Sequence, residues 1–427
     1  MNRKTILKKE HIKIFSLLSQ QGLLQVIDIL VAFLLIRYIP KVEYTLYLLA
    51  VGVSISMNTL SDMGLGSVML SEGGKVWQQD DKISELLNSY RILRYRLSLF
   101  FFALVGILTW YLFYLNHFSF ATFLIAIVLM LSDFWLKMGY HGNRYVLQLK
   151  GMSINLQRME TIGSLVKFIF VGVLLLLGIR SGLMLLIPLV IGSLITFELS
   201  KKKVDNFLVK SFNHTNEYFK PMKKKILNQI PYNIYSFFSS QINSFILSFF
   251  GTALIFADYN VLMKIGIFTN IIISFVSIYV NPIIAKAPKF SEFKKIYFRF
   301  LFLSLFLSAL FSLSVYIFKE TYISIVGFSF QTILPYIKPA LLLINLQLLF
   351  NYSISVNYAS GLNDKFWLLV PITILSQIVS FYIIDVSSIG GVINFNILSI
   401  LPSIIFSFIL SLVDGKKRFD DPQFQIN

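Results

Sequence analysis

The chain has 427 residues, of which 56% are hydrophobic and 14% are charged, and its formal net charge is +17 at pH 7. The charge does not indicate nucleic-acid binding, because the basic residues are divided among short loops and no soluble domain is large enough to present a groove. The absence of cysteine excludes disulfides and thiolate metal sites.

Twelve apolar stretches follow one another along the chain. Stretches of about 20 residues, at about 1.5 Å per residue, are long enough to cross roughly 30 Å of hydrocarbon. The sequence therefore predicts an all-α integral membrane protein with about twelve transmembrane helices. We expect them at residues 14–38, 44–69, 95–115, 118–138, 158–178, 183–199, 227–250, 254–281, 298–318, 333–357, 366–385 and 389–413.

The basic residues between these stretches predict the topology. With the N-terminus inside, 31 of the 38 Lys and Arg residues lie in or beside cytoplasmic loops and five lie outside. Cationic loops stay on the cytoplasmic side of a membrane. Both termini are therefore predicted to be cytoplasmic.

A basic loop divides the chain into two halves. We expect an N-terminal six-helix bundle at 1–200, a basic cytoplasmic linker at 201–226 and a C-terminal six-helix bundle at 227–427, with a central cavity between the bundles. At an offset of 215 residues, Glu43 and Tyr44 align with Asp258 and Tyr259, which suggests a parallel internal repeat.

Features of enzymes and pumps are missing from the sequence. The nearest approach to a phosphate loop, at residues 73–76, lacks the required glycine and hydroxyl spacing, and the four histidines have no zinc-site spacing. The predicted outside loops are short, which argues against an embedded polymerase or glycosyltransferase. We therefore expect a transporter that is not an enzyme and has no cofactor and no metal.

Two segments resemble a known family. Residues 35–44 (LIRYIPKVEY) with 61–66 (SDMGLG), and residues 257–264 with Asn281 and Pro282, are similar to the bacterial polysaccharide export flippases. That family belongs to the multidrug/oligosaccharidyl-lipid/polysaccharide (MOP) superfamily, and the length and span number favour its O-antigen (Wzx-type) branch. The chain departs from the pattern at Asn243, where the seventh span of such proteins often carries an acidic residue.

The resemblance implies a function and its partners. It implies a flippase of the bacterial inner membrane that moves an undecaprenyl-diphosphate-linked oligosaccharide, an O-antigen or capsular repeat unit, to the outer leaflet by alternating access. The expected partners are this substrate, membrane lipids, a polysaccharide polymerase and a chain-length regulator, with no nucleic acid. A drug or cation antiporter of the same superfamily is the main alternative, and its cavity should be more acidic than cationic.

Charges within membrane spans are functional candidates by default. Lys167 lies about ten residues into the fifth span, hence about 15 Å deep, and Lys264 lies at a similar depth in the eighth span. Both are candidates for binding the substrate phosphates, and the alternative for each is a structural ion pair.

Asp28 is the candidate for proton or ion coupling, since burial disfavours a charged carboxylate. Its alternative role is to pair with Lys167 or Lys264. Gln21, Gln25 and Asp28 form a polar stripe at i, i+4 and i+7.

Four amides are candidates for the polar lining of the cavity, namely Gln21, Gln25, Gln241 and Asn243. Asp62 and Asp133 are expected near the cytoplasmic ends of the second and fourth spans. There they would cap helices or fix loops.

Reporter fusions test the topology. Fusions after Lys203 and Arg418 should read as cytoplasmic, and fusions near Lys41 and Lys319 as extracytoplasmic, because of the distribution of cations. An extracytoplasmic signal after Lys203 would contradict the whole topology.

Overall fold

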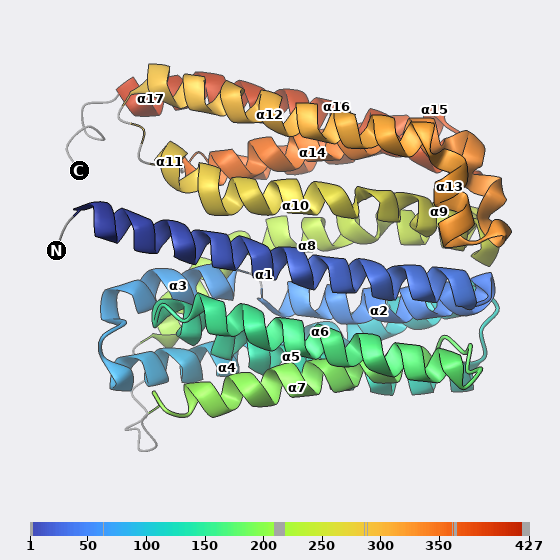
Figure 1. Ribbon diagram of the computed structural model, residues 1–427, viewed down its shortest axis with the longest axis horizontal. Coiled ribbons are helices and arrows are strands. Elements are labelled where there is room, and N and C mark those ends of the chain that lie inside the picture. The colour runs from blue at the N-terminus through green and yellow to red at the C-terminus, as the bar shows by residue number, and fades with distance from the viewer. Residues whose placement is uncertain are drawn as a thin grey trace. The chain divides into compact units, whose positions relative to one another are not determined.

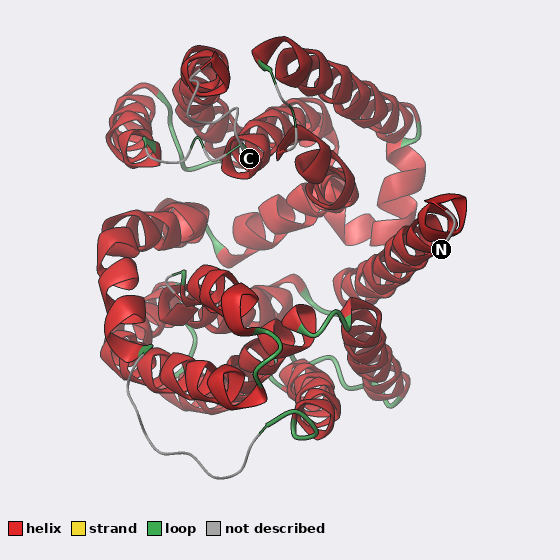
Figure 2. Ribbon diagram, turned by 90° about the vertical axis from the view of Figure 1, so that its left-hand side faces the viewer, coloured by secondary structure: helices red, strands yellow, loops and turns green. Residues whose placement is uncertain are grey.

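The computed structural model describes residues 3–420 apart from residues 63, 209–217, 286, 288, 361, 363 and 364. Within this described part all regular structure is helical, as Figure 2 shows, and no strand occurs. The chain divides into two compact units, Met1–Phe245 and Ile246–Asn427, which we call unit 1 and unit 2. The sequence-based division at 201–226 falls earlier and partly outside the described residues, and it stays a prediction.

Long helices that run in a common direction form unit 1 (Figure 1). They are α1 (Arg3–Tyr38), α2 (Lys41–Asp62), the shorter α3 (Leu65–Val76), α4 (Asp80–Leu115), α5 (Phe120–Leu149), α6 (Ser153–Leu176) and α7 (Ile187–Val204), the last preceded by the 3₁₀ turn η1 (Met184–Leu186). The helix α8 (Phe219–Phe250) continues from unit 1 into unit 2.

The helices of unit 2 are interrupted more often. Its first membrane segment consists of α9 (Ala253–Met263), the 3₁₀ turn η2 (Lys264–Gly266), α10 (Ile267–Phe275) and the π turn η3 (Val276–Val280), with α11 (Asn281–Ala285) after it. The segments that follow are α12 (Phe290–Ile317), α13 (Lys319–Val326), η4 (Phe328–Tyr336) with α14 (Ile337–Ala359), η5 (Phe366–Leu368) with α15 (Leu369–Ile383), α16 (Ile389–Ile409) with η6 (Leu410–Asp414), and α17 (Gly415–Asp420).

The predicted all-α membrane fold is confirmed, since helices occupy most of each predicted span; the second, 44–69, runs past the end of α2 at Asp62 into α3. Among the described residues, nine helical segments are long and apolar enough to cross a membrane. The first, second and seventh predicted spans correspond to α1, α2 and α8, which are helical but fall outside those nine.

Hydroxyl side chains cap three of the membrane helices. Ser119 accepts a hydrogen bond from the backbone of Thr122 at 3.2 Å, and Thr252 and Ser388 accept in the same way at the starts of α9 and α16. Such caps satisfy backbone donors that a helix leaves unpaired at its first turn. All three caps lie on the side that the sequence predicts to be extracytoplasmic.

Arg94 holds three helices of unit 1 together. Its side chain is 1% exposed, and its guanidinium donates to Asn58 Oδ1 at 2.9 Å and to Ser61 Oγ at 3.2 Å on α2. It also donates to Tyr90 OH at 2.5 Å on α4 and to the Met138 carbonyl at 3.5 Å on α5. A planar guanidinium with several fixed donors suits such a junction, because one side chain serves acceptors in several directions.

Residues 61, 62 and 64–66, which belong to one of the two segments with the family resemblance, lie beside this junction. Asp62 ends α2 and accepts from Tyr90 OH at 3.3 Å and from the Gly66 backbone at 3.5 Å, so its expected role in fixing a loop is confirmed. Gly64 has a φ of 81°, which favours glycine. At Gly66, a Cβ would lie 1.9 Å from the hydroxyl of Tyr145. The backbone conformation at Gly64 and the close approach of Tyr145 at Gly66 therefore explain why glycine stands at these two positions.

Arg94→Lys should lower stability. An ammonium cannot reproduce the fork of hydrogen bonds, and bonds to charged groups contribute about 1.5–3 kcal/mol each, so we expect a loss of about 2 kcal/mol. Thermal unfolding of the purified protein in detergent would measure it. Arg96→Lys is the matched control, because Arg96 is exposed on the same helix and contacts the Phe219 ring at 5.2 Å. Equal unfolding temperatures for the two variants would contradict the role of Arg94.

Candidate functional site

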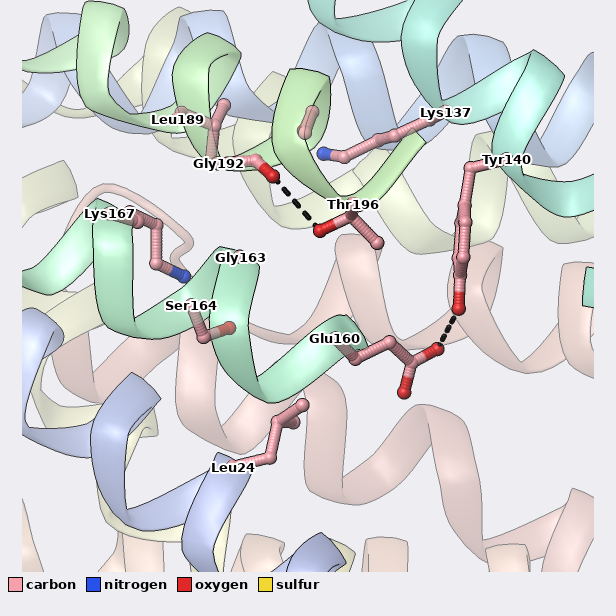
Figure 3. A pocket seen from close by; sticks show the side chains of 11 residues that line it. Leu24, Lys137, Tyr140, Glu160, Gly163, Ser164, Lys167, Leu189, Gly192 and Thr196 are labelled. Atoms are coloured by element: carbon pink, nitrogen blue, oxygen red, sulfur yellow. Dashed lines mark hydrogen bonds between the residues drawn. The ribbon is translucent and has the colours of Figure 1, made fainter. Parts of the chain in front are cut away.

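A cavity of about 240 Å³ lies inside unit 1, between α5, α6 and α7, with Leu24 of α1 on one side. We call it the unit 1 pocket. Figure 3 shows side chains from all three helices directed into it. The lining groups that carry charge or hydrogen-bonding atoms are Lys137, Tyr140, Glu160, Ser164, Lys167, Ser193 and Thr196.

A close crossing of α6 and α7 forms one wall of the pocket. A Cβ on Gly192 would lie 2.8 Å from the carbonyl oxygen of Gly163 and 3.3 Å from Cβ of Lys167. A Cβ on Gly163 would lie 2.0 Å from the hydroxyl of Thr196, which donates to the Gly192 carbonyl at 2.9 Å. Small residues allow membrane helices to approach this closely. The crossing therefore fixes where Lys167, one turn after Gly163, enters the pocket.

Lys167 and Asp28 form an ion pair between α6 and α1. Lys167 Nζ donates to Asp28 Oδ1 at 2.6 Å, and Ser164 Oγ lies 3.4 Å from the same oxygen. The side chains of Lys167 and Asp28 are 19% and 42% exposed. The sequence left two alternatives open for both residues, an ion pair or a functional role. The structure contains the ion pair between Lys167 and Asp28. Phosphate binding by Lys167 and ion coupling by Asp28 stay predictions.

Asp133 is the centre of a second cluster. Its carboxylate is 0% exposed and accepts from Ser54 Oγ of α2, from Ser193 Oγ of α7 at 2.5 Å and from Lys137 Nζ at 2.7 Å. Because Ser193 and Lys137 line the pocket, this cluster forms its second charged wall. The expected capping role of Asp133 is wrong, because α5 continues to Leu149 and Asp133 lies well inside it, where it connects α2, α5 and α7.

Glu160 completes the charged lining. Tyr140 OH donates to Glu160 Oε1, as Figure 3 shows, and Arg144 Nη1 lies 3.7 Å from the same oxygen. Three carboxylates thus surround the pocket, and each has a basic nitrogen within 4 Å. The pairs are Asp28 with Lys167, Asp133 with Lys137, and Glu160 with Arg144.

Lys264 belongs to unit 2 and is not part of this pocket. It is partly buried and begins the 3₁₀ turn that joins α9 to α10. Its proposed contact with phosphate stays a prediction. On the preceding turns of α9, Asp258 is 5% exposed and accepts from Thr332 Oγ1 at 2.7 Å.

The four amide candidates are dispersed. Gln25 is partly buried, and its Oε1 accepts no hydrogen bond within the described part of the chain. Gln241 lines a second, small cavity of unit 1 beside Gly52, and Asn243 is partly buried on α8. The side chain of Gln21 lies outside the described residues. Of the three whose side chains the structure describes, Gln25, Gln241 and Asn243, none lines the unit 1 pocket.

Sequence reasoning missed most of the pocket. Lys137 counts as a loop cation in the topology, and Glu160, Ser193 and Thr196 are not among the candidates. The one available signal was the i, i+4 spacing of Asp133 and Lys137, which allows an ion pair on one helix face. An ion pair between two different helices has no fixed spacing along the chain, so a single sequence does not reveal it.

Comparisons with known proteins identify the fold. No protein-family model and no curated protein sequence matches the chain. Among solved structures, an inward-facing multidrug resistance MATE family transporter of the MOP superfamily aligns with a TM-score of 0.68 at 13% identity, over 93% of this chain and 94% of that chain. The lipid II flippase MurJ, in an inward closed conformation, aligns with a TM-score of 0.67 at 15% identity, over 94% and 89%.

The chain has the fold of MOP superfamily transporters. A third structure, a MOP superfamily transporter from Pyrococcus furiosus, aligns with a TM-score of 0.65 at 11% identity, over 95% of this chain and 94% of that chain. Its binding pocket is described as having reverse polarity, which suggests a different function for that protein. Identities this low establish the fold alone, so the pocket itself must indicate the ligand.

Replacement of aspartate by asparagine should lower the stability of the protein more at Asp133 than at Asp28. Asp133→Asn removes the charge of a fully buried carboxylate that accepts from two serines and from Lys137, which is itself 30% exposed; hydrogen bonds to charged groups contribute about 1.5–3 kcal/mol each, so we expect a loss of about 2 kcal/mol. Asp28→Asn affects a half-exposed pair and should cost about 0–1 kcal/mol. Thermal unfolding of both variants in detergent tests this difference. A larger loss in Asp28→Asn would show that the pair between α1 and α6 is the more important one for stability.

Proposed function

We propose that the protein is a flippase of the bacterial cytoplasmic membrane that moves an undecaprenyl-diphosphate-linked oligosaccharide from the inner to the outer leaflet. The repeat unit would be that of an O-antigen or a capsule, and transport would proceed by alternating access with both termini in the cytoplasm. The observation that carries the proposal is Lys167 at the wall of a pocket inside a MOP-type fold.

The charges around the pocket support an anionic ligand. The charged side chains that line it are Lys137, Lys167 and Glu160, so its own lining is basic by one charge. Each carboxylate nearby is already paired with a basic nitrogen. A site for a cationic drug would instead need an acid that no lysine or arginine neutralises. A compact ammonium attracts a phosphate group more strongly where little water screens the two charges.

The volume of the pocket suits one phosphate or sugar group of a larger substrate better than a whole drug-sized molecule. Pockets for drug-sized ligands typically have volumes of about 300–1,000 Å³, whereas this pocket has about 240 Å³. A phosphate or a single polar group fits such a volume, and the isoprenoid chain would remain in the bilayer. Hydroxyls of Ser164, Ser193 and Thr196 offer further hydrogen-bonding positions to a phosphate or a sugar.

A drug or cation antiporter is the second candidate, favoured by the carboxylate of Glu160 at the pocket and by the likeness to the MATE transporter. The fold does not separate the two, since the solved structures include that MATE transporter and a lipid II flippase. Contacts with a polysaccharide polymerase and a chain-length regulator belong to the flippase proposal as expected partners.

Lys167→Ala should abolish surface polysaccharide while the protein remains in the membrane. Lys167→Arg should retain part of it, because the positive charge survives. Surface polysaccharide and protein abundance would be measured in the same cells. Lys202→Ala is the matched control, since Lys202 is an exposed lysine at the end of α7.

Two results would count against the proposal. Normal surface polysaccharide in Lys167→Ala would remove the phosphate role of Lys167. Efflux of a cationic dye by the wild type that is lost in Glu160→Gln, with polysaccharide unchanged, would favour the antiporter.

A further inference from the structure

Unit 2 exposes uncharged polar side chains on two of its membrane segments. On α10 and the π turn η3, Asn270 and Ser277 are exposed and Ser274 is partly buried, at spacings of four and three residues that place them on one side of the helix. On α14, Asn351 is exposed and Gln347, one turn earlier, is partly buried. The two helices contact each other and lie side by side in Figure 1. We call these five residues the amide face.

A hydrogen bond joins the two polar stripes of this face. Asn281 follows Ser277 by four residues, and Ser355 follows Asn351 by four residues, so each continues its stripe. Asn281 Nδ2 donates to Ser355 Oγ at 2.9 Å. Asn281 Oδ1 is buried and accepts no hydrogen bond from the described part of the chain. The two stripes therefore border each other, and a buried acceptor without a donor lies where they meet.

Hydrocarbon does not suit the amide face. Lipid-facing helices expose apolar side chains, such as Phe302 and Phe306 of α12 at 67% and 60%. The side chains of Asn270, Gln347 and Asn351 have no hydrogen-bond partner among the described residues. An amide placed in hydrocarbon without a partner loses the hydrogen bonds that it makes to water. The face therefore requires water or a polar ligand.

The amide face carries no charge, and this restricts the ligand. Residues 265–285 and 339–359 contain no Asp, Glu, Lys, Arg or His. A phosphate is bound most strongly by cationic donors, and metal ions require carboxylates, imidazoles or thiolates. Amides and hydroxyls instead offer neutral donors and acceptors side by side. These match the hydroxyl and acetamido groups of a sugar.

The backbone beside the face is irregular. The π turn η3 spans Val276–Val280 and contains Ser277, and the 3₁₀ turn η2 precedes α10. Single π turns inside α-helices are frequent at functional sites. The irregular turn and the exposed polar side chains are separate observations that point to the same place.

We propose that the amide face binds the neutral sugars of the lipid-linked oligosaccharide by hydrogen bonds from its amides and hydroxyls. This inference rests on the proposed function and adds the class of sugar that unit 2 recognises. Hexoses and N-acetylhexosamines satisfy the face. A uronic acid does not, because its carboxylate would leave water without meeting a cation.

The absence of cysteine from the chain allows a test by single-cysteine labelling of the full-length protein in proteoliposomes. Ser277→Cys reports on the face and keeps all its amides. Ile271→Cys is the matched control, since Ile271 is 38% exposed on the same α10 and next to Asn270. A charged thiosulfonate reagent on both sides of the membrane should modify Ser277→Cys and should react far more slowly with Ile271→Cys, because a thiol in hydrocarbon does not ionise.

Two ligands then distinguish sugar from lipid diphosphate. They are farnesyl diphosphate that carries the neutral disaccharide N,N′-diacetylchitobiose, and farnesyl diphosphate alone. At about ten times its Kd, the glycosylated ligand should slow the labelling of Ser277→Cys about tenfold, since only unoccupied protein reacts. Farnesyl diphosphate alone should leave the labelling rate unchanged.

A second substitution measures the contribution of one amide. With Ser277→Cys as the reporter, Asn351→Leu should raise the ligand concentration needed for protection about three- to tenfold, the effect of one lost hydrogen bond. Leu342→Ala is the control, because Leu342 is 53% exposed on the same α14 and is not part of the face. Thermal unfolding would confirm that each variant is folded.

Three results would overturn the sugar site. They are equal labelling of Ser277→Cys and Ile271→Cys, equal protection by both ligands, and protection by neither. Surface polysaccharide in Lys167→Ala tests the proposed function separately. Its loss there, together with an unprotected Ser277→Cys, overturns the sugar site and leaves the flippase proposal intact. Normal polysaccharide in Lys167→Ala, with Ser277→Cys protected by the glycosylated ligand alone, has the opposite meaning.

Discussion

Neutralisation of charge inside the protein is the constraint on which unit 1 depends. In the hydrocarbon of a membrane, a charge without a partner or water is costly. Unit 1 places three carboxylates near one pocket and gives each a lysine or arginine from the same or a neighbouring helix. These pairs connect α1 with α6 and α5 with α6, and hydroxyls extend the Asp133 cluster to α2 and α7. Electrostatic pairing therefore determines both how the helices pack and which charges a ligand meets.

The pairs differ in burial and in the number of donors that hold each carboxylate. Asp133 has three donors and no exposure, so it acts as a fixed point between α2, α5 and α7. Asp28 has one strong donor and is 42% exposed. A pair of the second kind can open at low cost. The crossing at Gly163 and Gly192 fixes where the backbone of α6 lies beside Lys167.

The sequence predicted which segments are helical and apolar, because stretches of apolar residues carry that signal directly. It did not predict how far α5 extends, because polar residues there are paired across helices. The fourth apolar stretch ends at 138, yet α5 continues through Tyr140 and Asn143 to Leu149. Tyr140 bonds to Glu160, and Asn143 bonds to Ser200 at 3.1 Å. Hydropathy counts such residues as the end of a span, but a partner on another helix lets the helix go on.

The suggested internal repeat can be compared at one aligned position, within each unit separately. Glu43, near the start of α2, accepts from the Gly182 backbone at 2.6 Å, and a Cβ on Gly182 would lie 2.2 Å from the carbonyl of Glu43. Asp258, on α9, accepts from Thr332 Oγ1 at 2.7 Å. In each unit the acid, on α2 in unit 1 and on α9 in unit 2, contacts a segment that precedes a later helix. The partners differ, a backbone amide in one unit and a hydroxyl in the other. The acid is thus the shared element, which explains why the alignment found the two carboxylates and no similarity in the segments that they bind.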